Sequence, residues 1–216
     1  MKVSQAVKQR KSIRGFLPTP VEDKVLSSLL ETAARAPSGG NVQPWRVYVI
    51  NNSRMDDFKA QLTDFSLSES EYPIYPPKLE EPYRTNRFEL GEEMYALLGI
   101  PREDKAARFA NMSKNYDFFG APAAFFCFID RNMGEAQWSD LGMFLQTFML
   151  LAEEAGLGTC AQEAWAMHHQ AVSKFVSAPE NEMLFCGMSV GYPDWDQPVN
   201  SLQSKRMPLH QWCTWV

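Results

Sequence analysis

The sequence predicts an α+β sandwich in which helices flank a small central sheet. Several segments carry apolar residues at helical spacing, whereas only a few short runs are rich in the β-branched and aromatic residues of strands. Because helices and strands alternate but the strands are few, a small sheet is favoured over a doubly wound parallel sheet. The chain also lacks a G-x-G-x-x-G motif and a P-loop, so it carries no signal for an ordinary dinucleotide-binding fold.

Composition predicts one globular domain spanning residues 1–216. Of the 216 residues, 45% are hydrophobic and 22% are charged, and no internal repeat or linker interrupts the chain. The net charge of -5 argues against a general nucleic-acid partner. The longest apolar stretch, 141–152, is too short to span a membrane, and the first residues lack the apolar run of a signal peptide. Four widely spaced cysteines are expected to be reduced thiols, which predicts a cytoplasmic protein.

The first third of the chain carries signals for two helices separated by a strand. Residues 19–22 (Thr-Pro-Val-Glu) match a capping box, and the helix that they open is expected to end at Pro37. Residues 45–50 have the β-branched and aromatic composition of a short strand. Ser53 is the expected cap of a helix that runs to about residue 65.

The next segment loses all periodicity. Residues 66–82 hold four prolines and two tyrosines, and irregular loops of this length are often lids or binding segments. A helix is expected over 84–98, so we predict that 66–100 form a lid or substrate wall. Pro101 is the expected start of another helix, which reaches about residue 114.

The last part of the chain is more apolar. Residues 123–129 predict a buried strand, and 138–155 predict a helix that is apolar nearly all round and is central to the domain or to a subunit contact. Residues 158–165 are interpreted as a connection to a helix over 166–176, which a strand over 183–190 follows. Residues 192–216, rich in proline and tryptophan, are predicted to form a C-terminal arm packed on a neighbour.

Two segments carry residues with a clear chemical meaning. Arg10 and Arg14 flank the Ser12 hydroxyl, an arrangement that can grip a phosphate, although a solvated basic turn is the alternative. The Gly/Ser/Asn loop at 37–45 offers backbone N–H groups and short amides to a flat ligand, or is an ordinary connection between helix and strand. Together they suggest a phosphorylated planar cofactor.

Other candidate residues are less specific. Glu163 stands at a predicted helix start, where it either complements the helix dipole or presents a free backbone N–H to a ligand. His168 and His169 are adjacent and share no helix face, so a metal site is disfavoured. No nucleophile–histidine–acid pattern, G-x-S-x-G motif or close carboxylate pair is present, and hydrolysis is therefore poorly supported.

These segments together resemble the FMN-dependent nitroreductase family, in the branch of nitroaromatic and nitrobenzoate reductases. The resemblance covers residues 10–208. It rests on five motifs in a fixed order, R-x-S-x-R at 10–14, P-S-x-x-N-x-Q-P-W at 37–45, F-F-G-A-P at 118–122, G-L-G-T at 156–159 and R-x-P at 206–208. The resemblance implies a three-layer sandwich with a mostly antiparallel sheet, and an intertwined homodimer with FMN at the subunit interface.

The resemblance also implies which residues contact FMN. Its phosphate would be held by Arg10, Ser12 and Arg206. The ribityl chain and the ring would contact Lys11, Arg14, Asn115, Gln162 and Glu163, the last through its backbone N–H to the flavin N5. A loop of the partner subunit would supply Pro37, Ser38, Gly39, Asn41 and Gln43. No side chain is expected to be catalytic and no metal is expected.

The implied activity is an oxidoreductase reaction in which hydride passes from NAD(P)H through the flavin to a nitroaromatic, quinone or similar acceptor in ping-pong turnover. Tyr72, Tyr75, Tyr83 and Trp138 would either stack on that acceptor or pack in the core. One alternative is a reductive dehalogenase of the same family, with Glu71, Tyr72 and Lys78 as its only lid candidates, in a spacing that does not match. Another is a flavin-binding protein without turnover.

Overall fold

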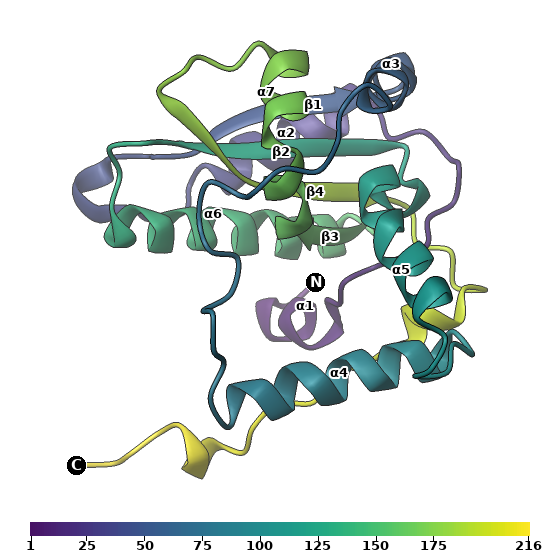
Figure 1. Cartoon of the computed structure of the whole chain (residues 1–216). Helices are drawn as coiled ribbons and strands as arrows, with labels where there is room; N and C mark the ends of the chain where they lie inside the picture. The colour runs from purple at the N-terminus through teal and green to yellow at the C-terminus, as the bar shows by residue number, and fades with distance from the viewer.

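The protein is an α+β structure, as the sequence predicts. A computed structural model describes all 216 residues. The four strands form one antiparallel sheet in the order β1 (Arg46–Asn51), β2 (Ala123–Asp130), β4 (Glu182–Gly191) and β3 (Gly158–Gln162). Figure 1 shows helix α7 (His169–Val176) in front of this sheet and helix α2 (Asp23–Ala33) behind it, which gives the expected three layers.

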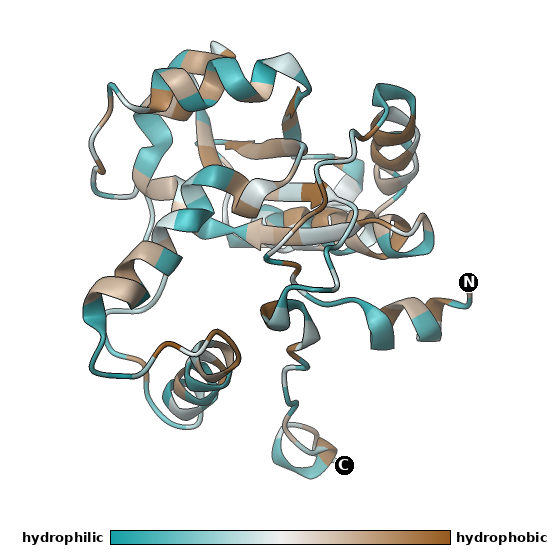
Figure 2. Cartoon of the chain, turned by 90° about the vertical axis from the view of Figure 1, so that its right-hand side faces the viewer, coloured by the Kyte–Doolittle hydropathy of each residue, from teal (hydrophilic) through white to brown (hydrophobic).

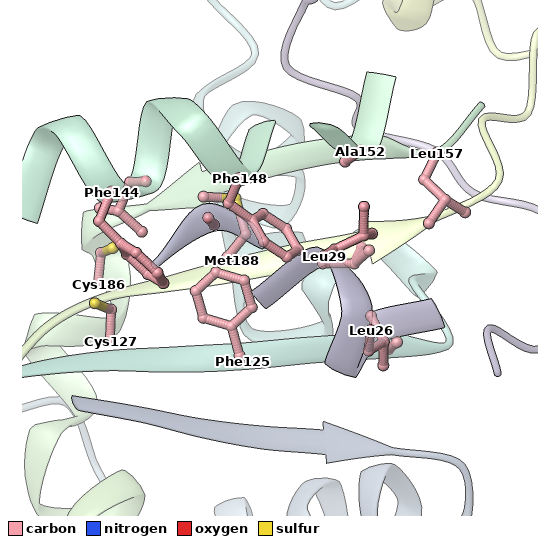
Figure 3. Close-up of a cluster of buried hydrophobic side chains, with 14 of the residues drawn as sticks. Leu26, Leu29, Phe125, Cys127, Phe144, Phe148, Ala152, Leu157, Cys186 and Met188 are labelled. Carbon is pink, nitrogen blue, oxygen red and sulfur yellow. The ribbon is translucent and has the colours of Figure 1, made fainter. Parts of the chain in front are cut away.

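Two apolar clusters hold the layers together, one on each face of the sheet. On one face, α2 and the long helix α6 (Glu135–Glu154) cover β2 and β4. There the rings of Phe125 and Phe148 pack edge to face, with their centroids 4.9 Å apart (Figure 3). On the other face, α7 and helix α3 (Ser53–Leu62) cover the same two strands around Trp165. Because both faces of the sheet are buried, β2 reads as the continuous apolar run from which it was predicted.

All four cysteines are free thiols. Cys127 and Cys186 are register partners on β2 and β4, and both are buried without forming a disulfide. Burial raises the pKa of both thiols, so they remain protonated and behave as small apolar core residues.

The prediction missed β3, because residues 158–165 were interpreted as a connection between helices. This strand is only five residues long and begins at the second glycine of the Gly-Leu-Gly at 156–158, so its signal is that of a helix stop. Gly158 is needed here for a reason outside its own element. A Cβ at this position would lie 2.6 Å from Cγ1 of Ile13, because the N-terminal segment packs against β3.

Several helix starts differ from the predicted ones. The proposed capping box at 19–22 is wrong, since α2 begins at Asp23 and no side chain caps it. The helix expected from Pro101 is α5 (Lys105–Ser113), whose true cap is Asp104, with its side chain accepting from the Ala107 N–H at 2.9 Å. Helix α7 begins at His169, because 163–168 form a 3-10 helix first.

Two further helices lie at the β3 edge of the sheet. Helix α1 (Val3–Gln9) and helix α4 (Tyr83–Leu97) lie beyond this edge in Figure 1. Residues 66–82 form no regular element, and the C-terminal segment extends away from the body (Figure 2). No helix combines the length and the apolar character that crossing a lipid bilayer requires.

Candidate functional site

A cavity of about 730 Å³ brings the two ends of the chain together. Arg10, Lys11 and Ser12 line it from the N-terminal side, and residues 204–208, which include Arg206, line it from the C-terminal side. One face of α4 forms the opposite wall. The three residues predicted to hold one phosphate thus share one cavity, although almost 200 positions separate Ser12 from Arg206 in the sequence.

Backbone pairing positions the N-terminal part of the cavity. Residues 10–14 run beside β3, with a bridge between Ser12 and Thr159 and a hydrogen bond from the Ile13 N–H to the Thr159 carbonyl oxygen at 2.9 Å. This segment therefore extends the sheet past its edge strand. Arg10 lies between the end of α1 and the bridge, which places its side chain beside α6.

A buried asparagine ties the two ends to each other. Asn200 is fully buried, its Oδ1 accepts from the Arg14 N–H at 2.8 Å, and its Nδ2 donates to the carbonyl oxygens of Gly15 and Asp194, both at 2.8 Å. Every hydrogen-bonding atom of this amide except one lone pair is in use. Sequence reasoning missed Asn200, because a single asparagine in a proline-rich tail carries no local signal.

Neither of the two arginines in the cavity, Arg10 and Arg206, pairs with a carboxylate. Arg10 Nη1 has only a weak contact to Met149 Sδ at 3.9 Å, and Arg206 Nη1 donates only to Ser204 and to the Lys205 carbonyl. Burial and then the neighbouring Arg206 lower the pKa of Arg10, while Glu153 opposes this from beyond ion-pair distance. Two guanidiniums held together without a carboxylate form a receptor for an anion.

Arg14 takes a different position. Its side chain donates from Nη1 to the Ser12 carbonyl oxygen at 3.4 Å, and it does not line the cavity with Arg10. Arg14 therefore does not share the cavity of Arg10 and Arg206, whereas the resemblance placed it at the ring and not at the phosphate.

The far end of β3 carries the second group of predicted residues. Gln162 is 2% exposed, its Oε1 accepts from Ser189 Oγ at 2.7 Å, and its Nε2 donates to the carbonyl oxygen and Oδ1 of Asn115 at 2.8 and 3.2 Å. This amide is directed into the protein and holds Asn115 in place, so its side chain does not face a surface ligand. Sequence reasoning missed Ser189, because a single serine within an apolar strand carries no signal that its hydroxyl binds another side chain.

Glu163 follows directly and is exposed. It is the first residue of the 3-10 helix, so its backbone N–H has no partner within that helix. Four residues of extended chain, about 13 Å, separate Thr159 beside Ser12 from Glu163. The edge of β3 thus presents a cationic cavity at one end and a free N–H at the other.

The predicted loop lies elsewhere. Its short helix at Gly39–Asn41 is exposed, and the Gly39 N–H donates to Asp140 Oδ2 at 3.1 Å. Arg10 contacts Met149, which is nine residues or about 13 Å further along α6. Within one chain, the loop and the cavity are therefore separate.

The loop has a defined shape of its own. Asn41 and Gln43 have left-handed backbone conformations, with φ of 59° and 51°. The Gln43 N–H donates to Ser38 Oγ at 3.0 Å. Gln43 Nε2 donates to the Asn41 carbonyl oxygen at 3.1 Å, and Pro37 is exposed at the start of the loop. Short polar side chains are thus used to fold the loop rather than to fill a core.

The four predicted stacking residues separate into two pairs. Tyr72 and Trp138 pack edge to face at 5.1 Å and both contact Phe185, so they belong to the packing between the 66–82 loop and the sheet. Tyr75 and Tyr83 line the cavity and are exposed. Only the second pair is available to a ligand of this cavity.

Comparisons with known proteins agree with this geometry. The sequence model of the nitroreductase family matches residues 7–192. The chain is 37% identical over 202 residues to a 4-nitrobenzoate reductase of Pseudomonas putida, covering 93% of this chain and 89% of that one. It is 32% identical to a nitrobenzene nitroreductase of Ectopseudomonas oleovorans, covering 99% and 96%. The crystal structure of the FMN and NADPH-dependent nitroreductase NfnB from Sphigopyxis sp. strain HMH superimposes with a TM-score of 0.95 at 39% identity, covering 100% and 99%.

Proposed function

Because the chain belongs to the nitroreductase family, we propose that it is an FMN-dependent oxidoreductase that uses NAD(P)H to reduce nitroaromatic or similarly electron-poor acceptors. The relatives are named for nitrobenzoate and nitrobenzene reduction, and the structural neighbour is described as dependent on FMN and NADPH. The observation that carries the proposal is the cavity that Arg10 and Arg206 share, in which neither guanidinium pairs with a carboxylate.

The residues of that cavity fit the phosphate of FMN. A phosphate dianion would supply the missing counter-charge for Arg10 and Arg206 and would accept from Ser12 Oγ, while Lys11, which lines the same cavity, would contact the ribityl chain. Bound FMN would supply the hydride chemistry between the nicotinamide and the acceptor. This explains why the chain needs no nucleophile or catalytic acid of its own.

The end of β3 would orient the flavin ring. The exposed Glu163 backbone N–H would donate to the ring nitrogen N5, and Gln162 would fix the start of this turn through Asn115 and Ser189. We keep Arg14 at the pyrimidine edge, where its positive charge would favour reduced flavin. Its backbone N–H is held by Asn200, and its side chain does not line the cavity of Arg10 and Arg206, which supports that placement.

We further propose a homodimer in which the loop of residues 37–43 belongs to the partner's flavin site. The loop is exposed and too far along α6 to reach the cavity of its own chain. Apolar side chains are also exposed on α1 and in the C-terminal arm, among them Val3 and Trp215, the latter at 86% exposure. A second copy of the chain would cover these side chains and complete the site.

The remaining expectations are proposals of the same kind. We propose one domain over 1–216, in which 66–100 wall the substrate site and 192–216 form an arm that packs on the partner. The cavity face of α4 supports the wall, and the exposed tryptophans of the tail support the arm. The four free thiols support a reducing compartment such as the cytoplasm.

The dehalogenase alternative finds less support in the lid. Glu71 is paired with Arg131 at 2.7 Å and lies 3.4 Å from His169, and the Tyr72 hydroxyl donates to the Phe185 carbonyl oxygen. Lys78 pairs with Glu80 at 2.7 Å. None of the three is free to hold an amino-acid substrate in this conformation.

Anaerobic titration of the purified yellow protein tests the proposal. NADPH should bleach the flavin absorbance, and 4-nitrobenzoate should restore it with reduction of the nitro group. A colourless protein that does not bind added FMN would refute the cofactor assignment. Flavin that stays oxidised with both nicotinamides would leave a binding protein, and reoxidation by iodotyrosine but not by nitrobenzoate would favour the dehalogenase.

A further inference from the structure

The α4 wall of the cavity presents a second set of ligand-binding groups. Tyr83, Asn86, Arg87 and Leu90 follow the spacing of one helix face, and all four line the cavity. Helix α4 has no buried residue, so this face is not used to build a core. A polar and aromatic stripe that faces a cavity rather than the core is available to a ligand.

Arg87 is the distinctive residue of this stripe. Its guanidinium carbon lies 4.2 Å from the centroid of the Tyr75 ring, which is half exposed. Arg87 forms no ion pair, whereas Arg84 on the same helix pairs with Glu81 at 2.6 Å. A guanidinium stacked on an aromatic ring keeps its N–H edge free for two oxygens of a single anion.

The charges of the cavity leave room for a second anion. Its lining contains five cations and two carboxylates, namely Arg10, Lys11, Arg87, Lys205 and Arg206 against Glu89 and Glu93. Lys205 already pairs with Glu93 at 2.6 Å. A single phosphate on Arg10, Ser12 and Arg206 therefore leaves Arg87 without a partner.

We propose that Arg87, stacked over Tyr75, binds the adenosine 2′-phosphate of NADPH and thereby sets a preference for NADPH over NADH. The inference rests on the proposed function, which requires a nicotinamide dinucleotide as hydride donor. Tyr75 and Tyr83 are exposed rings beside Arg87, and such rings provide a stacking surface for the adenine.

The position of Arg87 favours this ligand over the acceptor. In the proposed function, hydride transfer would take place beside the Glu163 N–H, which lies at the far end of β3, about 13 Å along the strand from Thr159 and its bridge partner Ser12. Arg87 lines the Ser12 end. A nitroaromatic acid is one ring long and cannot place its nitro group at one end and its carboxylate at the other, whereas an extended dinucleotide spans both.

The test compares Arg87→Gln with a matched control, Arg84→Gln, in the FMN-loaded protein with nitrobenzene as acceptor. Loss of a charge-assisted contact predicts a decrease of about 10- to 100-fold in kcat/KM for NADPH in Arg87→Gln. The value for NADH should stay within about twofold, because NADH lacks the 2′-phosphate. Arg84→Gln should leave the NADPH/NADH ratio unchanged, since Arg84 is paired with Glu81 and does not line the cavity.

A binding measurement gives a readout independent of turnover. Calorimetry with adenosine 2′-monophosphate and adenosine 5′-monophosphate should show tighter binding of the 2′-phosphate by the unmodified holoprotein, and Arg87→Gln should abolish the difference. Equal binding of the two nucleotides by the unmodified protein would overturn the proposal. Equal decreases in kcat/KM for NADPH and NADH in Arg87→Gln would also overturn it. So would an effect of Arg87→Gln that appears only when 4-nitrobenzoate replaces nitrobenzene as the acceptor, because this would assign Arg87 to the acceptor. Failure of the unmodified protein to oxidise either nicotinamide would instead refute the proposed function.

Discussion

Replacing Arg10 with methionine should weaken FMN binding without destabilising the protein that lacks FMN. Arg10 is half-buried beside Arg206, its guanidinium donates only weakly, to the Met149 sulfur at 3.9 Å, and it has no carboxylate partner. Burial and the second guanidinium lower its pKa, which means that the fold disfavours its charged form. The positive charge of Arg10 therefore serves to bind a ligand and does not stabilise the protein that lacks FMN.

The expected magnitudes follow from these contacts. A hydrogen bond between a guanidinium and a phosphate contributes about 1.5–3 kcal/mol, so Arg10→Met should raise the Kd for FMN by about 10- to 150-fold. In the protein without FMN, the substitution removes a repulsion and places a flexible apolar side chain against Met149. Its free energy of unfolding should stay within about 0.5 kcal/mol of the parent value or rise.

Two measurements separate these effects. Quenching of FMN fluorescence on titration gives the Kd, and chemical denaturation of the protein without FMN gives the stability. Arg35→Met is the matched control, because Arg35 is exposed and lies outside the cavity. A large loss of stability together with unchanged FMN affinity would show that Arg10 is a structural residue. The assignment of Arg10, Ser12 and Arg206 to the FMN phosphate would then be wrong.

Substitutions at four other positions test other parts of the structure. Glu163→Ala should retain flavin reduction by NADPH, whereas Glu163→Pro, which deletes the N–H, should abolish most of it in stopped-flow measurements. Equal losses would implicate the carboxylate instead. Gly187→Ala would push a methyl group into the Trp165 ring and should cost about 1–3 kcal/mol in chemical denaturation; Gly91→Ala, with open space around it on helix α4, should be neutral or stabilising. Burial and a hydrogen bond to Glu182 raise the pKa of Tyr48 to about 12. Because the unfolded phenol ionises first, stability should fall between pH 10 and pH 12, and Tyr48→Phe should flatten that decline in denaturation curves.

Sequence patterns predicted elements well where burial alone shapes them. The apolar run of β2 and the all-round apolar helix α6 were recognised because both lie in the core. Strand β3 was not recognised, since its pairing partners are β4 and the N-terminal segment, which its own five residues do not encode. The false capping box at 19–22 shows the same limit. These four residues match the sequence pattern of a helix start, but the tertiary structure begins α2 at Asp23 instead.

The candidate site was predictable to a different degree at each residue. Arg10, Ser12 and Arg206 were assigned to one phosphate through a family resemblance, and the structure places them in one cavity. Gln162 was assigned to the ligand, but its amide is consumed inside the protein, because a buried amide must satisfy its hydrogen bonds locally. A sequence motif gives the position of such a residue but not the direction of its side chain.

The convergence of the two chain ends has a physical cost that explains why a buried amide is needed beside the site. Bringing Arg10 next to Arg206 is unfavourable until an anion arrives, so something uncharged must hold the ends together in the meantime. Asn200 does this with three hydrogen bonds that no titration or ligand changes. The bridge between Ser12 and Thr159 adds backbone pairing on the other side. The arrangement of Arg10 and Arg206 is thus maintained by neutral contacts, and the positive charge of the two guanidiniums remains available for the binding of an anion.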